Sequence, residues 1–154
     1  MSETRRGTDL DSSKNSRLAQ VKESFRKQGV MKFLDARITK LRDGHVEITA
    51  KNRPGFSQQD GFVHAGIMAT LADNCAGYAT LSRLPSGSRV LAVEFKLNFI
   101  RPGIGDMIRG RARVRRLGKT LSVCEVYVEM RQDGKWVPCA WGSETVYCIR
   151  AKVN

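Results

Sequence analysis

One aspartate, Asp73, stands alone in a stretch of small and apolar residues that follows a His-Ala-Gly turn at residues 64–66. It is the only charged side chain between residues 67 and 81. A helix that is apolar around most of its circumference is usually buried. Burying a carboxylate lowers the stability of the fold unless the group is paired, so an unpaired one suggests a function. Poor solvation also makes a carboxylate more basic. Asp73 is therefore the best candidate in this chain for chemistry, as a general base or as a nucleophile.

Two helices and a tail account for the non-strand part of the sequence. The apolar segment around Asp73 predicts a helix over residues 66–84. Residues 14–28 carry apolar side chains at spacings of three and four, which predicts a shorter amphipathic helix that Gly29 ends. Residues 1–13 are polar and are predicted to form a disordered tail, which leaves 14–154 as the folded domain.

The remaining segments are predicted to be strands. Residues 33–41 and 46–50 flank Asp43-Gly44, a pair that is typical of a hairpin turn. Apolar and polar residues alternate in four further segments, 93–99, 108–115, 121–131 and 135–149, the last two joined at Asp133-Gly134. Long alternation of this kind is typical of antiparallel strands with one covered face. The predicted order is a helix, a hairpin, a long apolar helix and a four-strand meander.

A single apolar helix must be enclosed by other elements, and one antiparallel sheet curled around it satisfies both patterns. We therefore predict an α+β fold in which an antiparallel β-sheet wraps around a long central α-helix. An open α+β sheet would give the same string of elements. The other face and the edge of the sheet would be covered by a second copy of the chain, which predicts a homodimer.

Composition favours one soluble domain. The chain has 154 residues, 41% of them hydrophobic, and no uncharged apolar run approaches the roughly 20 residues that a membrane span needs. Its first residues lack the apolar core of a secretory signal. The four cysteines form no Cys-x-x-Cys pair, so we expect no metal site. Cysteines scattered through core-like segments suit a reducing cytosol, and we expect a cytoplasmic protein.

The chain is strongly basic, with a net charge of +12 and a pI near 10.1. Such a surface attracts polyanions. Four arginines, at positions 109, 111, 113 and 115, alternate with apolar residues along one predicted strand. They form either a solvated sheet face or a surface that attracts an anionic ligand. No nucleic-acid-binding motif is present and aromatic residues make up only 7%, so we expect no nucleic-acid partner.

Three segments resemble one known family. The run Gln58–Gly66, with Leu71-Ala72-Asp73 after it, resembles the hotdog-fold acyl-CoA thioesterases of the PaaI-like (phenylacetate-pathway) type. In that family a His-Gly-Gly turn leads into a central helix with an aspartate nine residues after the histidine. The run Val93–Pro102 resembles the strand after that helix, and Leu117–Leu121 resembles the family's Gly-Lys/Arg-Thr turn. The resemblance covers roughly residues 30–148.

The resemblance implies a single hotdog domain that forms dimers, often paired into tetramers, with active sites at the dimer interface. It implies hydrolysis of a coenzyme A thioester, so coenzyme A is part of the substrate and no cofactor is needed. Two positions depart from the family pattern. Ala65 replaces the middle glycine of the turn, and Ala92 stands where some relatives carry a serine that helps to position water.

Four residues are the candidate catalytic set. Asp73 would activate water or attack the thioester itself, two mechanisms that the sequence does not separate. Gly66 lies at the helix start, where a backbone N–H without an intrahelical partner can polarise a carbonyl oxygen. By resemblance, His64 shapes the turn and Gln58 orients the water or the carbonyl, with Gln59 as its substitute if the register slips by one. A purely structural role remains an alternative for each.

Coenzyme A carries phosphates and an adenine, so its site should offer basic groups. By resemblance, the groove is lined by Lys119, Thr120 and Leu121 at the turn, with Phe99 and Arg101 on the earlier strand. Lys119 is suited to bind a phosphate.

We therefore predict an acyl-CoA thioesterase that acts on medium-chain or aryl acyl groups. One alternative is a hotdog enoyl-CoA hydratase or dehydratase, for which Asp60 and His64 would be the acid-base pair. Another is a non-catalytic acyl-CoA-binding protein. The helix with a single aspartate favours hydrolysis over hydration, and the binding protein stays an alternative.

Overall fold

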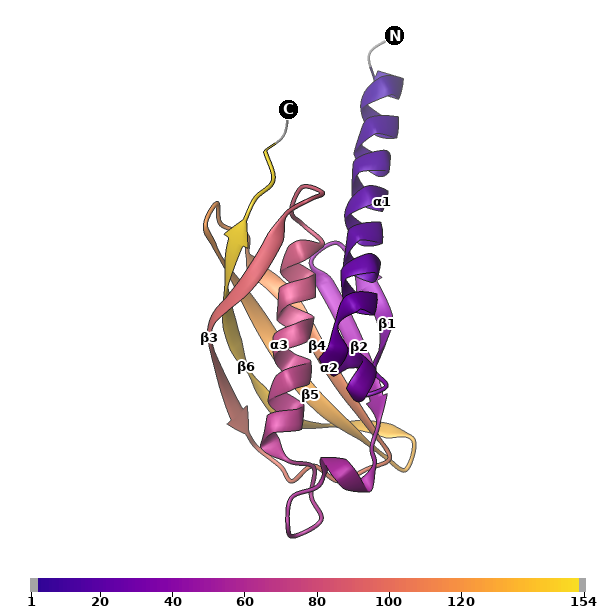
Figure 1. The fold of residues 1–154 in the computed structure, drawn as a ribbon, viewed down its shortest axis with the longest axis vertical. Helices are drawn as coiled ribbons and strands as arrows, with labels where there is room; N and C mark the ends of the chain where they lie inside the picture. Colours follow the sequence, from indigo (N-terminus) through magenta and orange to yellow (C-terminus); the bar gives the residue numbers. More distant parts are fainter. Residues whose placement is uncertain (1–2, 153–154) are drawn as a thin grey trace.

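One curved sheet wraps around a central helix in the computed structural model, which describes residues 3–152 (Figure 1). The six antiparallel strands have the order β1-β2-β4-β5-β6-β3, and helix α3 lies against the inner face of the sheet. The elements are α1 (Glu3–Lys27), α2 (Gly29–Phe33), β1 (Arg37–Arg42), β2 (His45–Lys51), η1 (Pro54–Phe56), α3 (Ala65–Leu81), β3 (Arg89–Phe99), β4 (Met107–Arg116), β5 (Leu121–Gln132) and β6 (Lys135–Ile149). This architecture confirms the predicted α+β fold with an antiparallel sheet around a long central helix.

Helix α3 can be enclosed because its side chains are small. Ala72, Ala76 and Ala79 are buried along it, and the helix packs against β4 and β5. The helix ends at Leu81, before the predicted end at residue 84. At this end the hydroxyl of Ser82 accepts a hydrogen bond of 2.8 Å from the backbone N–H of Gly44, which ties the helix to the β1–β2 turn.

Both predicted hairpin turns are present. Gly44 between β1 and β2 has a φ of 72°, and Asp133 and Gly134 between β5 and β6 have φ values of 49° and 75°. In the β5–β6 turn, positive φ at both central residues gives a twist that matches the two strands. On β4 the apolar residues of the alternating pattern are buried and face α3, as the period of two predicts.

The predicted four-strand meander is wrong. Strands β4, β5 and β6 do follow one another in the sheet, but β3 pairs with β6, and β4 pairs with β2. The segment between β3 and β4 runs past the start of α3, where the N–H of Val63 donates to Gly103 O, and reaches the end of β2, where Asn52 donates to Asp106 O. Alternation along a strand shows which way its side chains face and does not reveal its neighbours.

The N-terminal elements also differ from the prediction. Helix α1 begins at Glu3, so residues 3–13, predicted to be a disordered tail, belong to this helix, which no proline interrupts. Residues 1–2 of that tail lie outside the described residues. Gly29 starts α2 and does not simply end the first helix, and β1 begins only at Arg37, after residues 33–36. Among residues 3–152, no helix combines the length and the apolar character that a bilayer span requires.

The arginine stripe of β4 lies on the sheet face that points away from α3. Arg109 contacts Glu129 at 2.6 Å, Arg111 contacts Glu129 at 3.2 Å, and Arg115 pairs with Glu125. The Arg109 guanidinium also stacks over the ring of Trp136 on β6, and that of Arg111 over the ring of Tyr127 on β5. Much of the positive charge of this stripe is therefore compensated within the sheet, which favours the interpretation as a sheet face over a surface that attracts an anionic ligand.

We predict that Gly110→Ala lowers the free energy of unfolding by about 1–3 kcal/mol, the range for overpacking a core. A Cβ atom at Gly110 would lie 2.9 Å from Leu71 O and 3.0 Å from Cys75 Sγ, so the added methyl forces α3 away from β4. Urea denaturation followed by circular dichroism measures the change. The control is Gly55→Ala, where a Cβ meets nothing within 4 Å. Equal denaturation midpoints for the two variants would contradict the close packing of α3 on β4.

Candidate active site

One stripe of α3 remains accessible, whereas the other residues of the helix from Leu71 to Leu81 are buried. Gly66, Thr70, Asp73 and Gly77 follow one another at spacings of four, three and four residues, so they share one face of the helix. Gly66 is exposed and the other three are half-buried. The helix predicted to be apolar on nearly all sides therefore presents its one carboxylate on its one open face.

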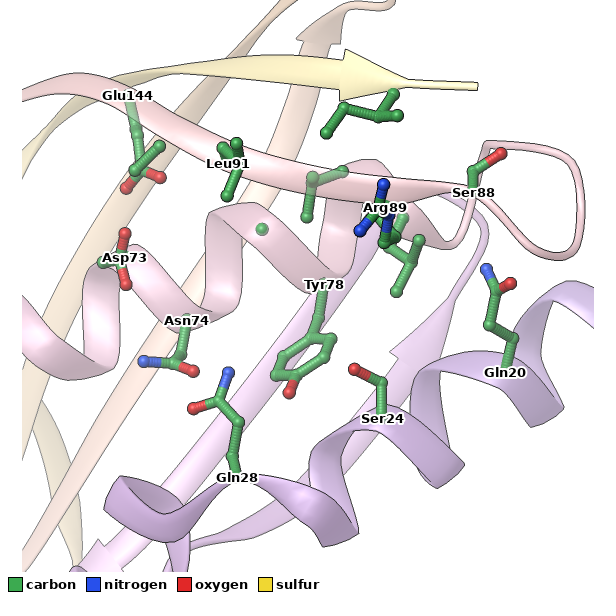
Figure 2. Close-up of a pocket in the computed structure, with 15 residues that line it drawn as sticks. Gln20, Ser24, Gln28, Asp73, Asn74, Tyr78, Ser88, Arg89, Leu91 and Glu144 are labelled. Atoms are coloured by element: carbon green, nitrogen blue, oxygen red, sulfur yellow. The ribbon is translucent and has the colours of Figure 1, made fainter. Parts of the chain in front are cut away.

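Asp73 opens into a cavity of about 390 Å³ (Figure 2). The cavity lies between α1, α3, β3 and the end of β6, and its polar lining consists of Gln20, Ser24, Gln28, Asp73, Asn74, Tyr78, Ser88, Arg89 and Glu144. Apolar side chains such as Leu81 and Val90 complete the walls. Within the described chain, no ion pair joins Asp73 to a lysine, arginine or histidine. The carboxylate is thus neither sealed in the core nor neutralised by a cation.

A second carboxyl group, that of Glu144 on β6, faces Asp73 across the cavity (Figure 2). Burial raises the pKa of Asp73 above its ordinary value, and a side-chain hydrogen bond with Glu144 opposes that rise. Burial, together with the charge of Asp73, raises the pKa of Glu144 to about 9. Two carboxyl groups form a hydrogen bond only when one of them carries a proton. Because the pKa of Glu144 lies well above neutral, Glu144 is the member of the pair that holds this proton at neutral pH.

The sequence analysis missed Glu144, although a signal was present. Ala140, Gly142, Val146 and Cys148 are the buried residues of β6 at alternate positions, and Glu144 stands in the same register. A charged residue on the inward register of a strand is rare unless it is paired or functional. The alternation along β6 would have identified Glu144 had it been examined position by position.

At the start of α3, His64 and Gly66 interact directly. The backbone N–H of Gly66 donates a hydrogen bond of 2.9 Å to Nδ1 of His64, which caps the helix. This contact fits the role of shaping the turn that the resemblance implies for His64. Gly66 and Asp73 are seven residues apart, which places them about 10 Å apart along the helix axis. Within one chain, a single thioester carbonyl cannot contact both.

Gln58, Phe99 and Arg101 come together beside the start of α3. They line a second cavity of about 400 Å³ with Ala65 and Met68. The Arg101 guanidinium donates to Pro138 O at 3.1 Å, and the Gln58 amide contacts a carboxylate oxygen of Asp60 at 3.3 Å. The structure thus groups three of the predicted substrate-contacting residues, but at a different place from Asp73.

Lys119, Thr120 and Leu121 lie at the opposite end of the sheet. Leu121 pairs with Tyr147 near the end of β6, whereas Phe99 pairs with Ala140 well before that end. All three residues of the turn are exposed. The Arg150 guanidinium, which the sequence analysis did not single out, donates to Lys119 O at 3.0 Å and adds a second cation beside the turn. In one chain the predicted groove for coenzyme A is therefore split between two ends of the molecule.

Ala92 lines the cavity of Asp73, at a β-bulge between β3 and β6. Its methyl group offers no hydroxyl to position water. Other polar groups reach this cavity, among them Asn74 and Tyr78 on α3 and Gln28 between α1 and α2 (Figure 2). The Asn74 Oδ1 and Tyr78 hydroxyl atoms are buried without a hydrogen-bond partner in the described chain.

Comparison with known proteins identifies the family of this chain. A model of the thioesterase superfamily matches residues 60–137, half of the chain, from the turn before α3 to the start of β6. A protein of Saccharolobus solfataricus named "Putative esterase" is 30% identical over 135 residues, which are 87% of this chain and 94% of that protein. The structure of a thioesterase family protein from Silicibacter pomeroyi superposes with a TM-score of 0.85 at 36% identity, covering 88% of this chain and 99% of that chain.

Two more distant structures share the fold. The PaaI protein of the Escherichia coli phenylacetic acid degradation operon has a TM-score of 0.78 at 20% identity and covers 91% of this chain and 96% of its own. A thioesterase protein of Streptococcus pneumoniae, solved with coenzyme A, has a TM-score of 0.72 at 23% identity and covers 85% and 98%. At these identities the likeness shows the hotdog fold and does not single out the PaaI-like type. The family match and the S. solfataricus relative show that this chain belongs to the thioesterase superfamily.

Proposed function

We propose that this protein is an acyl-CoA thioesterase that hydrolyses medium-chain or aryl acyl-CoA to the free acid and coenzyme A. The observation that carries the proposal is Asp73, a half-buried carboxylate with a raised pKa that opens into a cavity and forms no ion pair with a cation of the described residues. Such a group binds a proton more readily than an exposed aspartate, which is what a general base requires. Membership of the thioesterase superfamily supports this reaction class.

The chemistry follows from the groups around the thioester. Water, activated by Asp73, attacks the carbonyl carbon, the carbon–sulfur bond breaks, and the thiolate of coenzyme A leaves and takes up a proton. In the alternative, Asp73 attacks the carbonyl carbon itself and water hydrolyses the resulting anhydride. In both mechanisms the backbone N–H of Gly66 binds the developing oxyanion. In the free protein this N–H donates to His64 Nδ1, so the carbonyl oxygen of the substrate takes the place of His64 Nδ1 as its acceptor.

A homodimer would complete the site. β3 is an edge strand in the described chain, and its apolar residues Leu91, Val93 and Phe95 are 59%, 55% and 46% exposed. A long apolar edge strand that remained open would favour aggregation. A two-fold axis through the middle of β3 pairs this edge with itself in antiparallel orientation. The same axis places one end of a protomer's sheet beside the opposite end of its partner's sheet.

This symmetry would bring together residues that one chain keeps apart. Phe99 and Arg101 of one protomer approach Lys119–Leu121 of its partner, which rejoins the two halves of the groove for coenzyme A. One thioester can then contact Asp73 of one protomer and Gly66 of the other. The coenzyme A present with the S. pneumoniae thioesterase protein supports this ligand. We also propose that two dimers pair into a tetramer, as the resemblance to the PaaI-like thioesterases implies.

We expect Asp73→Asn to lower kcat about 100- to 10,000-fold, the range for a general acid-base group. The substitution keeps the size of the side chain and removes its basicity. Release of free thiol from a panel of medium-chain and aryl acyl-CoAs measures the effect, and circular dichroism checks the fold. Asp106→Asn is the matched control, because Asp106 pairs with Arg131 far from the cavity. Near-normal turnover by Asp73→Asn would remove Asp73 from the mechanism.

We expect Val93→Lys to convert the dimer to a monomer and to abolish thioester hydrolysis, because a charge at the centre of the β3 edge cannot be buried between two copies. Val30→Lys is the matched control, since Val30 is also an exposed valine, at 42%, but lies on α2 away from this edge. Sedimentation velocity measures the oligomeric state. A wild-type protein that sediments as a monomer, or a dimeric and active Val93→Lys variant, would contradict pairing through β3.

A further inference from the structure

Glu144 is a buried carboxyl group that makes no contact able to neutralise a negative charge. It is 1% exposed, and neither of its oxygens receives a hydrogen bond from a donor group of the described chain. A fully buried carboxylate in this state is strongly disfavoured, whereas a buried carboxylic acid is tolerated because it is neutral. The group therefore holds a proton that it can donate, and Figure 2 shows Asp73 directly opposite.

The surroundings of Glu144 contain acids and thiols. Asp73 and Cys75 reach it from α3, Glu94 from β3 and Cys124 from β5, and the charge of Asp73 acts on it more strongly than that of Glu94. Arg89 lines the same cavity but forms no ion pair with either carboxyl group. Every charged group that acts on Glu144 from these elements is thus negative, which opposes a second negative charge at this place.

We propose that Glu144 is a positioning residue that stays protonated during catalysis and donates a hydrogen bond to the carboxylate of Asp73, holding it toward the cavity. The catalytic part of this proposal rests on the proposed thioesterase function. Asp73 accepts the proton of the attacking water and passes it to the departing thiolate, while Glu144 keeps its own proton throughout. The protons balance, because the Asp73–Glu144 pair ends each turnover with the single proton that it had at the start.

This arrangement predicts two limits on activity with pH. Below the pKa of Asp73 the pair is neutral and has no base. Above the pKa of Glu144, about 9, a second negative charge appears in the cavity and opposes formation of the oxyanion. Ionisation of Glu144 therefore sets the alkaline limit of activity. Glutamine at this position keeps a hydrogen-bond donor for Asp73 but cannot ionise.

We expect wild-type protein at pH 7 to show the infrared carbonyl band of a protonated carboxylic acid, because exposed aspartates and glutamates are ionised at that pH. The band should disappear in Glu144→Gln and persist in Glu125→Gln, a control at a glutamate that pairs with Arg115 on the other sheet face. In wild-type protein the band should fade as the pH rises through about 9. A wild-type protein without the band, or one that loses it near pH 5, would overturn the proposal, even if Glu144→Gln fails to fold.

The pH profile of kcat/KM gives the second measurement. Glu144→Gln should retain activity within about tenfold of wild type at pH 7 and should lack the alkaline fall, whereas Glu144→Leu, which offers no donor to Asp73, should lose at least about tenfold more. A role in stability alone would leave the alkaline limit unchanged, and that result would overturn the proposal. If the infrared band behaves as expected while wild-type protein releases no thiol, the proton-sharing pair stands and the thioesterase function is what fails.

Discussion

The structure depends on enclosing one helix within one sheet while leaving a single stripe of that helix open. Helix α3 carries small side chains such as Ala72, Ala76 and Ala79, and Gly110 on β4 has no side chain where a Cβ would meet the backbone of Leu71. Close packing on most sides gives α3 a fixed place. Because Asp73 lies on the open stripe, its carboxylate is held by the core but still reaches the cavity. A looser helix would leave Asp73 solvated and an ordinary acid.

Low polarity around Asp73 also explains why the second carboxyl group, that of Glu144, does not ionise together with Asp73. Two carboxylates in water would repel each other weakly and ionise independently, but burial makes their joint ionisation costly. Glu144 reaches Asp73 because β6 presents it on the register that faces α3. The same sheet that encloses the helix therefore sets the charge of the site. The Ala92 position carries no hydroxyl in this chain, and polar groups at the cavity come instead from Gln28 between α1 and α2, from α3 and from Glu144.

In a single chain the residues proposed to bind coenzyme A are divided between two places, and this division has one structural cause. The β3 strand ends the sheet, its outer edge is apolar, and the groups expected to bind coenzyme A lie at opposite ends of that strand. A symmetric pairing of edges would satisfy the open strand and reunite those groups in one step. The edge and the divided site are therefore two consequences of the same topology, in which β4 pairs with β2 and leaves β3 beside β6.

The sequence by itself determined the elements and the candidate base. Periods of 3.6 and 2 and the Asp-Gly pairs depend on neighbours in the chain, so they predicted α3, the strands and both hairpin turns, and the lone charge at Asp73 identified the carboxylate. Only the tertiary structure decided the order of strands, the start of the N-terminal helix, the pairing of Asp73 with Glu144, and the separation of Gly66 from Asp73. These features depend on residues far apart in sequence, whose proximity follows from how the whole sheet closes around the helix.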